Sequence, residues 1–339
     1  MTVRIGVIGV GGMGACHARH VADLAGADLR WVADPDEANG AALAAELGCT
    51  WIAEGMDRIG STVAEAADCD AVVIACPDHL HHRYVMAALE RGLPVLAEKP
   101  LTVELQDARQ IVETEVAHGR RLVQLGFMRV YDERHEQVAD ALSRIGRPRH
   151  IRAVHRNTND GSRTVPQMLV ESVIHDIHTV RWLSGQEIVS VATSVVPGGA
   201  GTRLVLVTCR LADGAVAVLE FDDIATGYEV SVEVTAEHGN VVAAEPLRAA
   251  VRTDGMVMGS IGDDWFTPFL DTYRTEMRDF VASVEDGVPR GPSAWDGYAA
   301  QAVVEAAAAS ADADGMPTLV ELPATPALYG IDREARRRS

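Results

Sequence analysis

Positive charge is scarce in this chain of 339 residues: lysine and arginine together number 30, against 49 aspartates and glutamates. The formal net charge is -19 at pH 7. A protein this acidic has no broad positive field to attract a phosphate backbone, so we do not expect nucleic acid as a partner.

Cysteine and long apolar runs are also scarce. The five cysteines are scattered and never spaced as a metal or redox pair, which is typical of a reducing compartment. No apolar run approaches the roughly 18 residues of a membrane span, and the N-terminus looks like a glycine-interrupted strand rather than a signal peptide. These absences predict a cytoplasmic protein with no membrane partner.

Apolar residues make up 47% of the chain, enough to bury the cores of two domains. Up to about Leu122, short apolar runs alternate with amphipathic stretches, which predicts βαβ units and a parallel sheet. Beyond it, a helical stretch, Met168–Leu183, precedes alternating runs typical of antiparallel strands, with a hairpin turn at Asp213-Gly214. We predict an α/β nucleotide-binding domain over residues 1–124 and an α+β domain over residues 125–339.

A glycine-rich segment, Gly9–Gly14, has the GxGxxG spacing and lies between a predicted strand and a predicted helix. In a dinucleotide site Gly9 permits the tight turn, Gly11 lets the backbone approach a pyrophosphate, and Gly14 allows close packing of helix on strand. Asp34 closes the next predicted strand, where a carboxylate accepts hydrogen bonds from a ribose 2'-hydroxyl and repels a 2'-phosphate. The pattern predicts NAD rather than NADP as the cofactor.

The chain has a single lysine, Lys99, directly after the predicted strand Pro94–Ala97. Where arginine has replaced every other lysine, the remaining one is expected at a place where arginine cannot act, because only the ammonium can lose its proton. We predict that Lys99 is catalytic and that the nearby Pro77, His79 and Glu98 line the cofactor site. The predicted cofactor-binding set is Gly9, Gly11, Gly12, Met13, Gly14, Asp34, Pro77, His79, Glu98 and Lys99.

The predicted helix Met168–Leu183 places Glu171, His175 and His178 at i, i+4 and i+7, on one side. In a dehydrogenase, His175 takes the hydroxyl proton while Glu171 orients it or relays the proton. The alternatives are a solvated polar face and a divalent metal site of a hydrolase or lyase, built from the same three residues. Since a metal would not explain the glycine-rich segment, we predict no metal.

Taken together, these residues resemble the Gfo/Idh/MocA oxidoreductases, through GVGGMG at 9–14, Asp34, and AEKPL at 97–101. Within that family the sequence is more similar to the inositol 2-dehydrogenases. The segments that carry this closer resemblance are RLVQLGFMRVYD at 121–132, HRN at 155–157, ESVIHDIHTVRWL at 171–183 and GPSAWDGYAA at 291–300.

This resemblance implies a Rossmann domain, a C-terminal domain with a large open antiparallel sheet, a homotetramer built through those sheets, and NAD-dependent oxidation of a ring hydroxyl, as in the conversion of myo-inositol to scyllo-inosose. It implies that Lys99 and His175 are the catalytic pair. It also implies a polyol pocket lined by Met128, Arg129, His155, Asn157, His178 and Tyr228.

Two positions depart from the family pattern. Glu171 stands where myo-inositol enzymes usually carry aspartate, and His178 stands where they usually carry an acidic residue. Each change alters the pocket, so the substrate could also be another inositol isomer, an aminocyclitol or a pyranose. A nucleotide-binding regulator without catalysis is a further alternative, which the presence of both Lys99 and His175 disfavours.

Overall fold

A computed structural model of the chain describes residues 2–53, 69–198, 201–244, 250–253, 256–259 and 262–330. The chain divides into two compact units. The first comprises the described parts of 1–128, 271–298 and 324–339, and the second comprises those of 129–270 and 299–323. The predicted division at residue 124 therefore differs from the structure, because 271–298 returns to the first unit.

The first unit is built on a six-stranded sheet in the order β3-β2-β1-β4-β5-β6, in which all neighbours run parallel. Its strands are β1 (Val3–Ile8), β2 (Ala27–Ala33), β3 (Thr50–Ile52), β4 (Ala71–Ile74), β5 (Val95–Ala97) and β6 (Val123–Leu125). The strand order reverses between β1 and β4, and such a reversal is where parallel sheets bind ligands at their carboxyl ends. The predicted Rossmann arrangement is confirmed.

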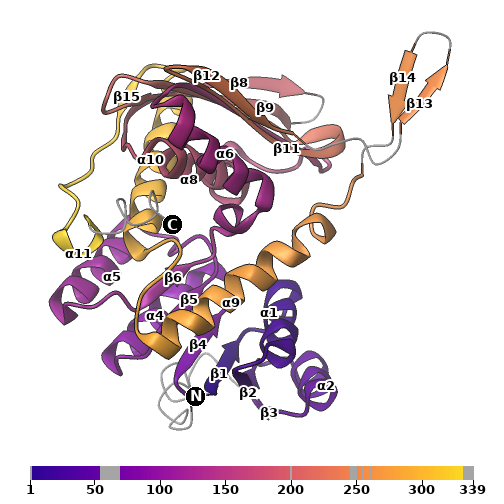
Figure 1. The fold of residues 1–339 in the computed structure, drawn as a ribbon, viewed down its shortest axis with the longest axis vertical. Coiled ribbons are helices and arrows are strands. Elements are labelled where there is room, and N and C mark those ends of the chain that lie inside the picture. Colours follow the sequence, from indigo (N-terminus) through magenta and orange to yellow (C-terminus); the bar gives the residue numbers. More distant parts are fainter. Residues whose placement is uncertain are drawn as a thin grey trace. The chain divides into compact units, whose positions relative to one another are not determined.

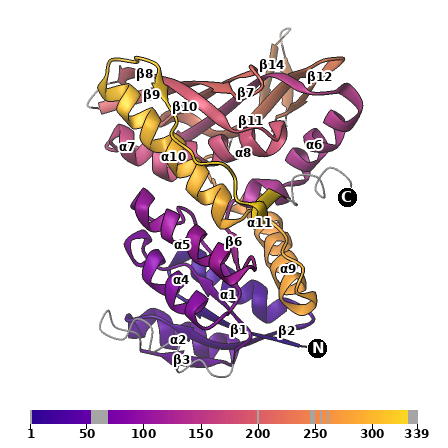
Figure 2. The same cartoon turned by 90° about the vertical axis from the view of Figure 1, so that its left-hand side faces the viewer.

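Helices cover this sheet and bury its apolar strands. They are α1 (Gly12–Asp23), α2 (Glu37–Leu47), α4 (His81–Glu90), α5 (Leu105–His118) and α9 (Leu270–Asp286). The short helix α11 (Ala327–Gly330) contacts α5 through Tyr329 and Glu115. Figure 2 shows α4 and α5 side by side. Met277 and Phe280 of α9 join a core that also contains Val21 of α1 and Leu43 of α2. A segment far along the sequence thus completes the core of the first unit.

The second unit is built on a seven-stranded sheet in the order β12-β11-β7-β10-β9-β8-β15. Its strands are β7 (Pro148–Thr158), β8 (Ile188–Gly198), β9 (Gly201–Leu211), β10 (Val216–Asp222), β11 (Ile224–Ala236), β12 (Gly239–Ala243) and β15 (Thr318–Leu319). A separate antiparallel pair comprises β13 (Ala250–Thr253) and β14 (Met256–Gly259). The predicted turn at Asp213-Gly214 joins β9 to the antiparallel β10, with Gly214 at a φ of +89°.

This sheet is mixed rather than wholly antiparallel, because β7 and β10 run parallel. Parallel neighbours need a long connection, and here the chain passes through two helices and two strands before β10 returns beside β7. The α-helical and π-helical elements within this unit include α6 (Glu133–Ile145), α7 (Val165–Met168), a π-helical turn (Leu169–Val173) and α8 (Ile174–Ser184). A further helix, α10 (Ala294–Asp312), begins in the first unit and continues in the second.

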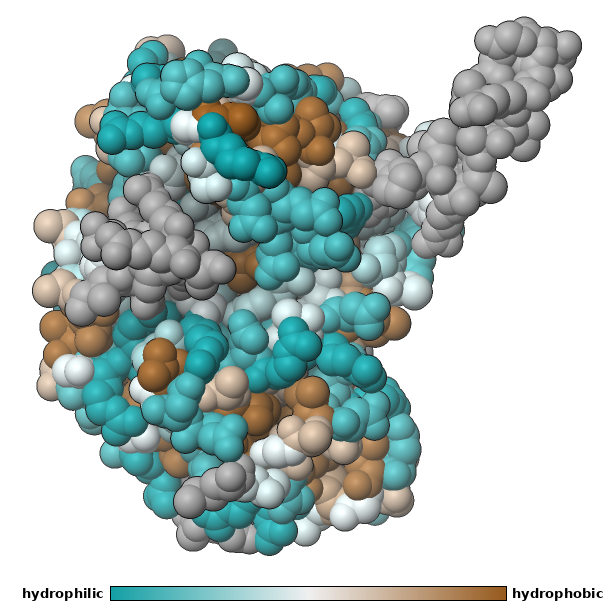
Figure 3. Space-filling model, in the orientation of Figure 1, coloured by the Kyte–Doolittle hydropathy of each residue, from teal (hydrophilic) through white to brown (hydrophobic). Residues whose placement is uncertain are grey.

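One face of the second sheet is covered by helices, as Figure 1 shows for α6 and α8. The contacts run from α6 to β11 and β12, and from α8 to β7 and β10. Val138 of α6 is buried, whereas the solvent side of this helix is largely hydrophilic (Figure 3), as expected for an amphipathic helix. Within the described residues, no helix is both long and apolar enough to cross a membrane.

Candidate active site

The glycine-rich turn between β1 and α1 has the backbone geometry that its sequence predicts. Gly9 has a φ of +82°, a left-handed conformation that side chains disfavour. A Cβ at Gly14 would lie 1.8 Å from the carbonyl oxygen of Gly9, so α1 can approach β1 only without a side chain there. No described atom lies within 4 Å of a Cβ built at Gly11 or Gly12, and Met13 follows in the first turn of α1. This turn therefore leaves room for a ligand at Gly11 and Gly12.

Asp34 lies directly after β2 and contacts this turn. Its carboxylate accepts hydrogen bonds from the backbone amides of Val10 and Asp36, both at 2.8 Å. No side chain caps the N-terminus of α1, which leaves its first amides available to an anion. The glycine-rich turn and the predicted ribose-binding carboxylate are thus brought together, and this arrangement fits a dinucleotide.

Lys99 lies at the carboxyl end of β5 and is partly buried. Its backbone amide donates to Oε2 of Glu98 at 3.2 Å, and Oε1 of Glu98 lies 2.8 Å from Nε2 of His17 on α1. Burial alone would raise the pKa of Glu98, but the hydrogen bond with His17 and the charge of Lys99 hold it below its ordinary value. Glu98 therefore stays ionised and ties the end of β5 to α1.

A second acidic side chain in this unit, Glu276 of α9, is completely buried, and neither of its carboxyl oxygens has a hydrogen-bond partner among the described residues. Burial, together with the charge of Glu98, raises its pKa well above 4.5. Sequence reasoning missed Glu276.

The histidines near Pro77 occupy the start of a helix. Pro77 precedes a short 3-10 turn that contains His79, and both are exposed. His81 begins α4 and is buried, with its ring nitrogens 2.7 Å from the carbonyl oxygen of Pro100 and 2.9 Å from that of Cys76. His81 therefore connects the loop after β4 to the loop that carries Lys99.

The helical stretch predicted at Met168–Leu183 is interrupted. A π-helical turn at Leu169–Val173 separates α7 from α8, so Glu171 and His175 are not in one α-helical register. Glu171 is exposed, His175 is partly buried, and His178 is 1% exposed. The expected single polar face is therefore not what the structure contains, because the wide π turn shifts Glu171 relative to the residues of α8.

A buried polar cluster in the second unit contains Arg129, His155 and Asp176. Arg129 forms an ion pair with Asp176, and its Nη2 lies 3.2 Å from Nδ1 of His155. Burial lowers the pKa of His155, so this ring is neutral at pH 7. Burial alone would raise the pKa of Asp176, but Arg129 and His155 hold it below its ordinary value. The cluster thus combines one buried ion pair with a neutral histidine.

Of the other predicted pocket residues, Tyr228 contacts this cluster. The ring of Tyr228 is 5.9 Å from that of His155 and edge-on to it. Asn157 donates through Nδ2 to Oγ of Ser172 at 3.4 Å. Met128, buried at the end of the first unit, directly precedes Arg129 along the chain.

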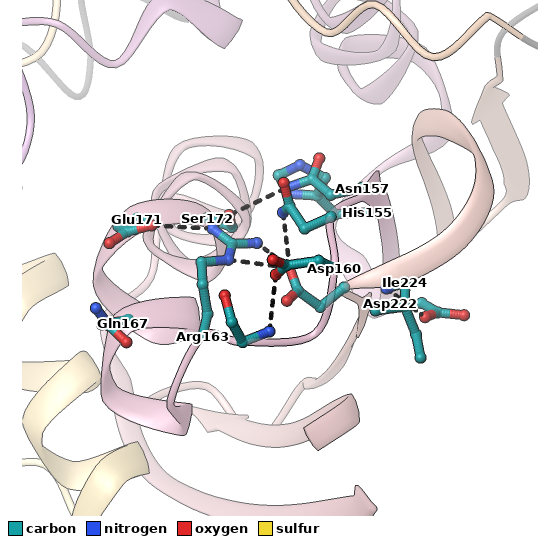
Figure 4. Close-up of polar contacts among 12 residues, drawn as sticks. His155, Asn157, Asp160, Arg163, Gln167, Glu171, Ser172, Asp222 and Ile224 are labelled. Atoms are coloured by element: carbon teal, nitrogen blue, oxygen red, sulfur yellow. Dashed lines mark hydrogen bonds and ion pairs between the residues drawn. The ribbon is translucent and has the colours of Figure 1, made fainter. Parts of the chain in front are cut away.

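Arg163 lies at the centre of a second network, which Figure 4 shows. Its Nε donates to Oδ1 of the buried Asp223 at 3.0 Å, and its Nη1 donates to Glu171 at 3.0 Å and to Ser172 at 3.2 Å. Glu171, the predicted partner of His175, is thus paired with an arginine that the sequence did not indicate. Within the described part of the chain, no group of three His, Cys, Asp or Glu side chains could hold a metal ion.

Sequence reasoning missed Asp176, Ser172, Arg163 and Asp223. Asp176 could have been found, because a carboxylate between Ile174 and Ile177, on the apolar side of the predicted helix, needs a buried partner. The pair Arg163 and Asp223 is 60 residues apart, and no sequence pattern indicates it.

Comparison with known proteins gives two family matches. Residues 3–127 match the oxidoreductase family with an NAD-binding Rossmann fold, and residues 137–242 match the GFO/IDH/MocA C-terminal domain. Inositol 2-dehydrogenase 1 of Saccharopolyspora erythraea is 40% identical, over 97% of this chain and 100% of that protein. Inositol 2-dehydrogenase of Cereibacter sphaeroides is 38% identical, with the same coverage. The crystal structure of myo-inositol dehydrogenase from Lactobacillus casei in complex with NAD(H) and myo-inositol is 29% identical, with a TM-score of 0.89 over 97% of this chain and 100% of that one.

Proposed function

Because the chain belongs to the Gfo/Idh/MocA oxidoreductase family, we propose that it oxidises a secondary hydroxyl of a cyclitol to a ketone with NAD, most directly myo-inositol to scyllo-inosose. The observation that carries the proposal is the 40% identity, over nearly the whole of both chains, to an inositol 2-dehydrogenase.

In this proposal the chain's own residues orient the ring and move one proton. His175 takes the proton of the reacting hydroxyl as general base, and the ammonium of Lys99 donates a hydrogen bond to the same oxygen. NAD, when bound, accepts the hydride that leaves the ring carbon. Asn157 and His155, together with Met128, Arg129, His178 and Tyr228, supply the polar and aromatic wall of the ring site.

The proposed cofactor site fits a dinucleotide without a 2'-phosphate. The glycine turn and the uncapped N-terminus of α1 supply amides for the pyrophosphate, and the Asp34 carboxylate supplies the ribose acceptor. Pro77, His79 and Glu98 complete the site in this proposal. Changing Asp34 to serine is expected to lower the ratio of kcat/KM for NAD over NADP about tenfold; an unchanged ratio would remove Asp34 from the ribose site.

The proposal extends to the assembly and its compartment. We expect a cytoplasmic homotetramer associated through the second sheet, where Val189, Val195 and Val196 of β8 are 37%, 38% and 39% exposed. Light scattering of the purified protein tests the tetramer, and a monomer would contradict it.

The deciding experiment is NADH formation, followed by absorbance, with a panel of inositol isomers, aminocyclitols and aldopyranoses. Oxidation of myo-inositol with reduction of NAD would establish the proposed activity. Oxidation of another ring alcohol instead would support the same mechanism with a different substrate. If no ring alcohol reduces NAD while the protein binds NAD in calorimetry, the proposed activity is wrong.

A further inference from the structure

The guanidinium of Arg163 is held in place by the buried carboxylate of Asp223. Asp223 has no exposed surface, and its Oδ1 accepts from Nε of Arg163 at 3.0 Å and also from Nη2. The same oxygen accepts from Nδ2 of Asn159 at 2.8 Å. The guanidinium also lies over the ring of Phe221, 5.4 Å from its centroid. Arg163 is therefore held by Asp223 and by aromatic packing, and it is not free to swing away.

The opposite edge of the guanidinium faces the residues of the π-helical turn. Nη1 of Arg163 donates to Oε2 of Glu171 at 3.0 Å and to Oγ of Ser172 at 3.2 Å. Asn157 contacts that same hydroxyl at 3.4 Å. Figure 4 shows Asn157, Ser172 and Glu171 gathered around the end of Arg163. The cation thus positions a half-exposed carboxylate and, through Ser172, the side chain of a proposed substrate-binding residue.

Charge decides what this arrangement can bind. Glu171 is 45% exposed and Arg163 is 17% exposed, so a ligand can reach both. The Glu171 carboxylate is already neutralised by the guanidinium, and an ammonium that displaced Arg163 from it would still lie beside a cation that Asp223 keeps in place. The repulsion between the ligand ammonium and the neighbouring guanidinium would raise the free energy of binding. A site with this repulsion therefore binds the charged ligand less well than the neutral one.

We propose that Arg163 is a specificity-determining residue, which pairs with Glu171 so that the site selects uncharged ring polyols over their amino-substituted analogues. The inference rests on the proposed function, because it requires that the ring bind beside Asn157 and Glu171. It assigns to Glu171 a positioning contact with Arg163 instead of a role in proton transfer.

The test compares kcat/KM for myo-inositol with kcat/KM for 1-amino-1-deoxy-myo-inositol, which keeps the ring configuration and is cationic at neutral pH. The wild type is expected to prefer the neutral ring. Arg163→Met removes the guanidinium beside the Glu171 carboxylate and should raise the amino-to-neutral ratio about tenfold. Glu171→Gln leaves the cation and should lower the same ratio severalfold. The double variant should return toward the wild-type value.

Two further variants guard against loss of folding and provide a control. Arg163→Met leaves Asp223 buried without its cation and could fail to fold, so Arg163→Met with Asp223→Asn removes both charges and should raise the ratio in the same way. The control is Arg152→Met, which breaks the pair with Glu220, 2.7 Å apart on the sheet, and should leave the ratio unchanged.

Opposite shifts for the Arg163 and Glu171 variants support the inference, because a merely structural role would lower both rates together. Shifts in the same direction, no shift, or a wild type that prefers the amino ring would each overturn it while leaving the dehydrogenase activity established. A wild type that oxidises no ring alcohol would instead refute the proposed function, and the inference with it.

Discussion

The two units hold their candidate site residues in position by different physical means. In the first unit the glycine turn is defined by its backbone. Gly9 has a φ of +82°, and the backbone approaches Gly14 too closely for any side chain there. In the second unit the polar residues are held by buried ion pairs, Arg129 with Asp176 and Arg163 with Asp223. A turn defined by its backbone restricts the residue type at a small number of glycine positions. A site made of paired side chains changes its charge and hydrogen bonding when either partner is substituted.

The largest expected effect concerns Lys99, the side chain of the first unit to which we assign chemistry. Lys99→Ala should lower kcat about a thousandfold, since removing one positioned hydrogen-bond donor to the reacting oxygen costs roughly that much in rate. Lys99→Arg should fail to restore it, because the planar guanidinium cannot take the place of the compact ammonium beside that oxygen. NAD affinity, measured by calorimetry, should stay within about threefold of the wild type. Unchanged turnover in Lys99→Ala would show that chemistry does not reside at this residue.

The next effect is the loss of a buried ion pair in the second unit. Asp176→Asn leaves the Arg129 charge buried without its counter-ion, and the free energy of unfolding in urea should fall by about 3–5 kcal/mol. The control is Asp286→Asn, which breaks an exposed pair with Arg290 and should leave the unfolding midpoint in place. Equal effects of the two substitutions would mean that the buried pair does not stabilise the second unit.

A smaller effect distinguishes two neighbouring glycines. Gly14→Ala places a Cβ against the carbonyl of Gly9 and should cost about 1–3 kcal/mol of unfolding free energy without cofactor. Gly12→Ala meets no described atom within 4 Å and should leave that free energy unchanged. Chemical denaturation of both proteins measures the difference, and a tolerated Gly14→Ala would contradict the close approach of α1 to β1.

The smallest effect is a pH dependence. Because the pKa of Glu276 is raised above 4.5, the folded chain binds a proton that the unfolded chain has released, and stability falls as pH rises above 4.5 toward the raised value. Glu276→Gln lacks this proton uptake. Its stability relative to the wild type should grow with pH, by at most about 1.4 kcal/mol per pH unit. Urea unfolding at acidic and alkaline pH measures this, and a constant difference would show that Glu276 is ionised when folded.

The difference between the units also explains what the sequence could predict. The tight turn at Gly9–Gly14 could be predicted because its backbone geometry requires glycine at fixed spacing, and the parallel sheet could be predicted from the alternation of apolar runs with amphipathic stretches. The mixed sheet was not found, because alternation indicates a strand without giving its neighbour. Arg163 was missed because its partners lie at 171, 172 and 223, and only the folded chain brings those positions together.

The π-helical turn had no sequence signal that we recognised. The apolar residues Val173, Ile174 and Ile177, at its end and just after it, are buried, each at most 1% exposed. Their spacing, extended back to Glu171 at 3.6 residues per turn, gave the wrong register, because one wide turn precedes α8.

The position of the only lysine, at the carboxyl end of β5, has a practical consequence. Reductive methylation with isotopically labelled formaldehyde would attach a label to one side-chain amine in the whole chain, with the terminal α-amine as the only other amine target. The methyl resonance of Lys99 would then be a single spectroscopic reporter at the proposed catalytic position. Titrating it with NAD or with a ring alcohol would follow events at that nitrogen without crystals and without any substitution in the protein.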